Sequence, residues 1–72
     1  MVNDPSSIRK HSVIIAGHET SVSIENAFWD GLRSIAREQS LSINGLVAKI
    51  DSSRHGNLSS AIRLYVLQHT KG

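Results

Sequence analysis

The sequence predicts a small α+β fold, mostly helical, that is completed by a second copy of the same chain. Polar and apolar residues alternate over residues 20–24, which is typical of a half-buried β-strand. The apolar spacing then becomes helical after residue 25, and it is helical again after residue 42. A lone strand leaves its backbone donors and acceptors unpaired. We therefore expect the strands of two chains to pair as an antiparallel ribbon about a two-fold axis.

The first predicted helix follows the strand directly. It begins near Glu25 or Asn26, where an acidic side chain suits the positive helix end, and it ends near Gln39. Gly31 lies inside this helix, where glycine costs about 1 kcal/mol relative to alanine. Either this glycine permits the close approach of another backbone, or it is tolerated on an exposed side of the helix.

Two further helices are predicted. Ser42 is a good N-cap for the second helix, which ends in a polar stretch that contains Gly56. The third helix runs from about residue 57 to residue 69, and it is apolar on so much of its surface that we expect burial across the dimer. The expected dimer core consists of apolar residues from the strand and the three helices: Val22, Ile24, Phe28, Leu32, Ile35, Ile43, Leu46, Val47, Ile50, Leu58, Ile62 and Tyr65.

The residues that precede the strand allow two arrangements. Residues 1–8 are expected to form a flexible arm, and residues 9–70 a single domain. Residues 12–16 are rich in β-branched side chains and resemble a strand. In one arrangement residues 10–16 form a hairpin with residues 19–24, turning at Gly17-His18, and the dimer has a four-stranded sheet. In the other, they form an extended arm on the body. We favour pairing of residues 12–15, because three consecutive apolar residues require cover.

Composition excludes several classes of protein. A chain of 72 residues holds one domain, and the absence of cysteine excludes disulfides and thiolate metal sites. No apolar run approaches the roughly 20 residues of a membrane span, and the first ten residues lack an apolar signal core, so we expect a cytoplasmic protein. Eight Lys and Arg against six Asp and Glu give a net charge of +2. This charge permits nucleic-acid binding without requiring it.

Catalytic and metal chemistry is not indicated. The four histidines lack the spacing of a metal site, so we expect no metal and no cofactor. No nucleophile stands at a recognisable spacing from a base, and the five glycines are too isolated to form a phosphate-binding loop. We therefore expect a protein that is not an enzyme.

Residues 20–51 resemble the ribbon-helix-helix family of small dimeric bacterial DNA-binding proteins. The order and spacing carry the resemblance: an alternating strand runs straight into an amphipathic helix, and Ser42-Ile43-Asn44 begins a second helix. The resemblance implies an antiparallel ribbon, with one strand from each chain, that enters the DNA major groove. The third helix lies outside this minimal pattern.

The resemblance also implies which residues contact bases. If the chain matches the family's strand, these are Glu19, Ser21 and Ser23, which alternate with the apolar positions. No Arg, Lys, Asn or Gln lies on that face of the strand, so it offers no bidentate recognition of guanine or adenine. The alternative is a face that is merely solvated, or covered by the preceding strand.

Two groups of residues are expected to contact DNA phosphates. The resemblance implies the first group, Ser42, Ile43 and Asn44, whose backbone amides lie at the positive end of the second helix. The second group is a basic cluster of Arg9, Lys10 and His11, which could reach phosphates as an arm.

The function expected is therefore sequence-specific DNA binding by a homodimer that regulates transcription. The alternative is a dimeric protein-interaction module, an adaptor or antitoxin-like protein, that has lost its base-contacting residues. Such a module would bind a protein partner through its N-terminal arm or its last helix.

Overall fold

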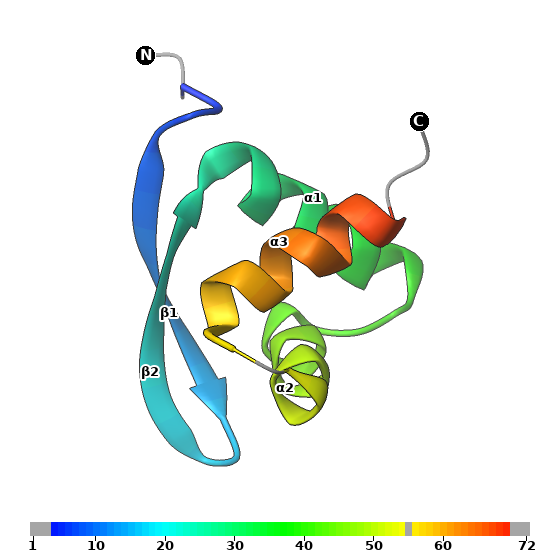
Figure 1. Ribbon diagram of the computed structural model, residues 1–72. Helices are drawn as coiled ribbons and strands as arrows, with labels where there is room; N and C mark the ends of the chain where they lie inside the picture. The colour runs from blue at the N-terminus through cyan, green and yellow to red at the C-terminus, as the bar shows by residue number, and fades with distance from the viewer. Residues whose placement is uncertain (1–3, 55, 70–72) are drawn as a thin grey trace.

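The structure is a computed structural model that describes residues 4–54 and 56–69. Two strands precede three helices, and the helices all lie on one side of the strands (Figure 1). This α+β, mostly helical architecture confirms the predicted fold class, including the third helix and the additional N-terminal strand. The elements are β1 (Ile8–Ile15), β2 (His18–Glu25), α1 (Asn26–Glu38), α2 (Ile43–Ser53) and α3 (Leu58–His69).

The two strands form an antiparallel hairpin within one chain. Ser12 lies opposite Ser21, and Val22 lies opposite His11, so the hairpin arrangement is confirmed. The premise that the strand at residues 20–24 has no partner in its own chain was wrong, because residues 8–15 supply one. Val22 and Ile24 are only 3% and 0% exposed without any second copy. Their burial therefore does not itself require a dimer.

The hairpin turns one residue earlier than predicted. Ala16 and Gly17 are its two loop residues, and both have a positive φ, of 52° and 81°. A two-residue loop with two positive φ values has the twist of the flanking strands. His18 is the first residue of β2 and pairs with Ile15.

The core lies between the inner face of the hairpin and the three helices. All of the residues expected in a dimer core are buried or packed against the core within the single chain. Val13, Ala36 and Val66 are also buried, although they were absent from that expected set. Four expected core residues are only partly buried: Phe28, Ile43, Leu58 and Tyr65.

Gly31 brings α1 close to α3. A Cβ atom built at Gly31 would lie 2.8 Å from Cγ1 of Val66, closer than real Cβ contacts allow. Gly31 therefore makes room for a neighbouring element, but the neighbour is a side chain and not the backbone that was expected. The two helices pack at this point only because the glycine has no side chain.

The helix ends use recognisable caps. Ser42 caps α2 by accepting a hydrogen bond from the Gly45 amide (2.9 Å), as predicted. Asn57 likewise accepts from the Ser60 amide (2.8 Å) in the first turn of α3. At the end of α1, Ser40 has a φ of 57°, and the Leu41 amide donates to the Ala36 carbonyl (2.8 Å). That bond is typical of a Schellman motif, in which one residue takes a left-handed conformation.

The segment before β1 satisfies the start of α1. The Pro5 and Ser7 carbonyls accept from the amides of Ala27 (3.0 Å) and Asn26 (2.9 Å), which have no partner within the helix. The buried Asn26 side chain also donates to the Asp4 carbonyl (2.9 Å). Residues 4–7, part of the segment expected to be a flexible arm, thus form the cap of the first helix.

Candidate nucleic-acid interface

One face of the hairpin points away from the helices. We call it the outer face, and its side chains are exposed from Ile8 to Ile14 of β1 and from Glu19 to Ser23 of β2. The three expected base-contacting residues lie on it together. Antiparallel pairing puts their partners from β1 on the same face. The exposed residues of the outer face are Ile8, Lys10, Ser12, Ile14, Glu19, Ser21 and Ser23, whereas Glu25, opposite Ile8, is half-buried and pairs with Arg63 of α3.

The outer face contains a cation that β2 does not supply. The β2 side of this face has no Lys or Arg, and Lys10 of β1 lies opposite Ser23. The physical reason is that β1 adds a second row of side chains beside the first. The strand that precedes β2 lies next to it and does not cover it, so Ser21 and Ser23 remain exposed. Serine hydroxyls and a lysine ammonium are able to hydrogen-bond base edges.

The start of α2 is attached to the hairpin. Asn44 accepts a hydrogen bond from the Ile14 amide through Oδ1 (3.2 Å), and Ser42 is occupied as the N-cap. Two of the three residues expected at phosphate therefore have structural roles, and Ile43 is half-buried. The positive end of α2 nevertheless lies beside the last residues of β1.

The basic cluster is part of β1 and not a loose arm. Lys10 lies on the outer face, whereas Arg9 and His11 belong to the opposite side of the strand and approach α1. His11 stacks on Trp29 with ring centroids 4.0 Å apart and planes 8° from parallel. Together the two elements line a hollow of about 360 Å³, which we call the basic hollow. Its residues are Arg9, Lys10, His11, Asn26, Trp29, Asp30 and Arg33.

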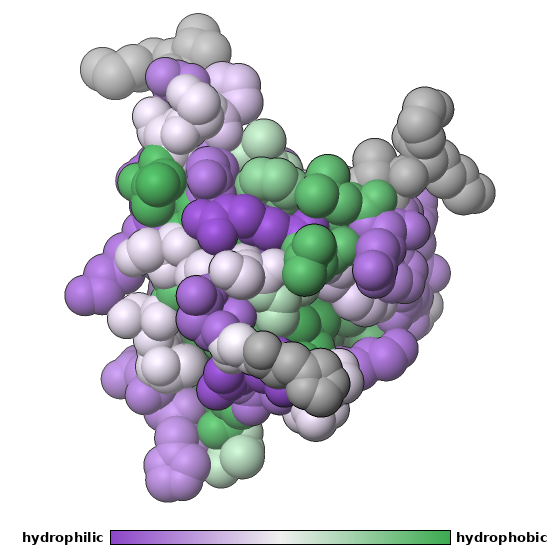
Figure 2. Space-filling model, viewed as in Figure 1, coloured by the Kyte–Doolittle hydropathy of each residue, from purple (hydrophilic) through white to green (hydrophobic). Residues whose placement is uncertain are grey.

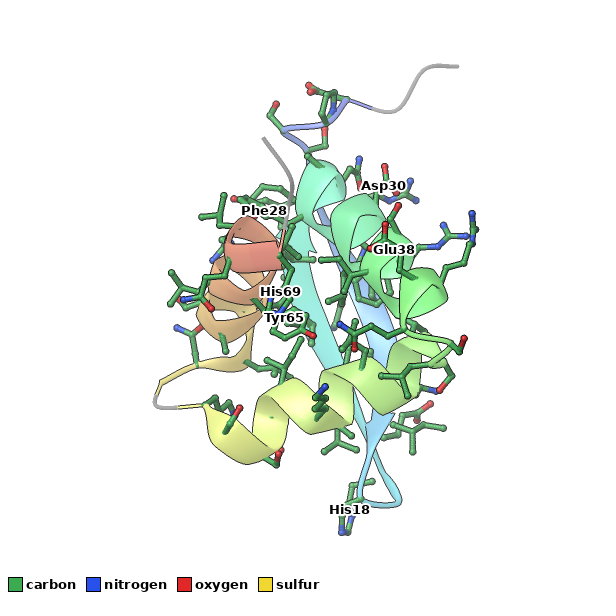
Figure 3. The ribbon with its side chains drawn as sticks, turned by 90° about the vertical axis from the view of Figure 1, so that its right-hand side faces the viewer. His18, Phe28, Asp30, Glu38, Tyr65 and His69 are labelled. Atoms are coloured by element: carbon green, nitrogen blue, oxygen red, sulfur yellow. The ribbon has the colours of Figure 1, made fainter. Side chains whose placement is uncertain are left out.

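The α1 residues of the basic hollow were not recognised from the sequence. Neither Trp29 nor Arg33 was among the residues expected to contact DNA. Figure 3 shows that Asp30 points away from α3, whereas Phe28 lies on the side of α1 that faces α3. Residues 26, 29, 30 and 33 follow helical spacing, so a common face was detectable. Their approach to β1 was not.

The surroundings of His11 favour its neutral form. Burial lowers the pKa of His11, and the positive charges of Arg9 and Arg33 lower it further. The carboxylate of Asp30 raises it. Its Nε2 atom is buried and has no hydrogen-bond partner among the described residues. The positive charge of the basic hollow therefore comes from its lysine and arginines.

Two arginines outside the basic hollow form ion pairs with carboxylates. Arg54 contacts Asp51 (2.6 Å), and Arg63 contacts Glu25 (2.7 Å). The hydrogen bond from Arg63 holds the pKa of Glu25 below its usual value. In contrast, no ion pair joins a cation of the basic hollow to any other residue that the structure describes.

A comparison with known families decides the assignment. A family model described as the ribbon-helix-helix domain matches residues 8–70. The chain belongs to the ribbon-helix-helix family. The match begins at the first residue of β1 and includes α3, so both elements outside the minimal pattern lie within the matched domain. No curated protein and no solved structure matched.

Membership of the ribbon-helix-helix family supports a general role in DNA binding. Domains of this family are regulatory DNA-binding modules, found in transcriptional regulators and antitoxin-like proteins. Within the described ranges, 4–54 and 56–69, no helix is long and apolar enough to cross a membrane. The same residues contain no group of three His, Cys, Asp or Glu side chains that could hold a metal ion.

Proposed function

We propose that this ribbon-helix-helix protein is a homodimeric, sequence-specific DNA-binding regulator of transcription in the bacterial cytoplasm. Its outer face would enter the major groove. The observation that carries the proposal is an open, polar face on a two-stranded ribbon. At its centre, Ser12 lies opposite Ser21, and Lys10 forms no ion pair with a described residue. Exposed Ile8 and Ile14 add apolar atoms that suit contact with thymine methyl groups.

The phosphate contacts of the proposal lie at the sides of the ribbon. Backbone amides at the start of α2 are held beside β1 by the bond between Asn44 and Ile14. A helix N-terminus in this position binds phosphate without a cation. Such contacts would fix the register of the protein on DNA, and the outer face would supply the sequence preference.

The width of the DNA major groove favours insertion of the two-stranded hairpin of a single chain. Two paired strands are about 5 Å apart, whereas pairing β2 with a second β2 gives four strands that span roughly 14 Å. The major groove is only about 12 Å wide. The Ser59 hydroxyl also donates to the Ser23 carbonyl (2.9 Å), so α3 already satisfies part of the backbone of β2.

Cross-linking tests which strands pair in the dimer. Under mild oxidation, Ser21→Cys should give no covalent dimer beyond the amount formed by Ser52→Cys, a cysteine in the last turn of α2. Rapid and complete cross-linking at position 21 would instead place the two β2 strands side by side, because disulfides require Cα atoms within about 7 Å. The intersubunit ribbon would then be the correct arrangement.

DNA binding itself is tested by salt dependence. The affinity for random-sequence duplex DNA should fall steeply with salt, since each neutralised phosphate adds about 0.9 to the log–log slope. Selection from a random duplex pool should then give a different preferred sequence for Ser21→Ala and Ser23→Ala than for the wild type. Ser52→Ala, outside the outer face, is the control. A flat salt response would contradict the proposal.

A protein-interaction role is the second candidate. Leu64 and Leu67 on α3 are 58% and 62% exposed, and Figure 2 shows hydrophobic surface gathered over this helix. An antitoxin-like protein would use such a surface to bind a protein partner. The salt experiment separates the two roles, because a module that binds only protein has no phosphate contacts to lose.

A further inference from the structure

We propose that the basic hollow binds a phosphate group of the DNA backbone, as a contact separate from the start of α2. This inference rests on the proposed function and names a further site for it. The site is formed between β1 and α1, with Arg9 and Arg33 from the two elements on its walls. It adds residues of the first helix to the DNA-binding surface.

The charge of the basic hollow favours an anion. Three cations, Arg9, Lys10 and Arg33, stand against one carboxylate, Asp30, which leaves two positive charges (3 − 1). Asp30 lies more than 4.0 Å from the nitrogen atoms of these cations, since no ion pair joins them. Arginine presents its donors as a planar fork that matches the oxygens of a phosphate. An incoming phosphate would therefore meet donors that no described carboxylate has taken.

The walls of the hollow favour a polar group over an apolar small molecule. Pockets for small organic ligands of about 300 Å³ and more are lined mainly by apolar side chains. Here Trp29 is the apolar member, and it is already stacked on His11. The stacked pair leaves little apolar surface for a ligand, but it holds the β1 and α1 walls at a fixed separation.

The position of the hollow favours DNA as the source of the phosphate. Lys10 lines the basic hollow and also a second hollow beside the outer face, together with Ser12, Glu19 and Ser21. The two hollows therefore meet at the edge of β1. When a ribbon lies in the major groove, its edges face the walls of the groove, and those walls are sugar-phosphate backbone.

Substitution of Arg33 tests the inference. Arg33 is exposed on α1, outside the hairpin, and Lys49→Gln removes the same charge from an exposed position on α2 that lines none of the hollows described. Arg33→Gln should weaken duplex DNA binding about tenfold, as for loss of one charged contact, and lower the salt slope by roughly 0.9 per phosphate. Lys49→Gln should change affinity less than about twofold, because exposed charges are screened within about 10 Å. Asp30→Asn should strengthen binding.

Trp29 provides an independent signal. It is the one tryptophan of the chain and lies in the wall of the hollow, so its fluorescence reports occupancy. Duplex DNA should change the emission of the wild type saturably, and Arg33→Gln should shift that titration to higher DNA concentration. Circular dichroism of each variant should match the wild type, since all three replaced side chains are exposed.

The outcomes separate the inference from the proposed function. Equal weakening by Arg33→Gln and Lys49→Gln would overturn the phosphate site while DNA binding stands. A second outcome is that DNA has no effect, whereas pyrophosphate changes Trp29 emission in the wild type and not in Arg33→Gln. The hollow would then bind a free phosphate compound, and the proposed function fails. If neither probe acts, both are overturned.

Discussion

Replacing Val22 by aspartate leaves the chain unfolded at 25 °C without denaturant. Val22 is almost fully enclosed between the hairpin and the helices. The change removes about 1.5 to 3 kcal/mol of apolar burial and encloses a carboxylate without a partner, which costs about 3 to 5 kcal/mol. A chain of 72 residues has a total stability of roughly 4 to 11 kcal/mol. Far-UV circular dichroism of the purified variant should therefore show loss of helix.

The neighbouring residue provides the matched control for that experiment. Ser21 is adjacent in sequence but lies on the outer face, so Ser21→Asp adds the same carboxylate to solvent. It should keep the helical spectrum and the unfolding midpoint of the wild type. A folded Val22→Asp protein, or an unfolded Ser21→Asp protein, would show that the two faces of β2 have been assigned in reverse.

Replacing Gly31 by valine should lower the free energy of unfolding by about 3 kcal/mol. The new Cβ would lie 2.8 Å from Val66, and two methyl groups would follow it into the contact between α1 and α3. Overpacking of this kind typically costs 1 to 3 kcal/mol, and occasionally more. The gain in helix propensity over glycine is only a few tenths of a kcal/mol, so the steric cost decides the sign. Urea unfolding followed by circular dichroism measures the change.

A double variant identifies the steric cause. Val66→Ala makes room beside Gly31, so Gly31→Ala should cost less in the Val66→Ala background than in the wild type. The difference between the two costs is the coupling energy of the contact. If Gly31→Ala costs the same in both backgrounds, the two helices do not meet at these residues.

These predictions separate stability from DNA binding along one hairpin. The inner side chains of β2 hold the core, and the outer ones are free to vary without loss of fold. Lys10, Ser12, Ser21 and Ser23 therefore offer positions where sequence preference could change while the scaffold is retained. Asn44 differs from them, because its side chain supports the backbone of β1.

The strand at residues 20–24 shows where inference from the sequence stopped. Its alternation predicted a strand with Val22 and Ile24 inside, and the structure agrees. The step from an unpaired strand to an obligatory second copy failed, because β1 satisfies the same strand within the chain. Support for a dimer therefore comes from membership of the ribbon-helix-helix family and not from burial of the strand.

The sequence alone determined β2, the three helices and the faces of β2, because these follow from the spacing of apolar residues over a few neighbours. It also placed Glu19, Ser21 and Ser23 on one polar face. Only the tertiary structure decided that Lys10 joins that face and that His11 stacks on Trp29. Those contacts join positions far apart in the chain, and their geometry depends on strand register and helix packing. No local pattern of residues specifies either.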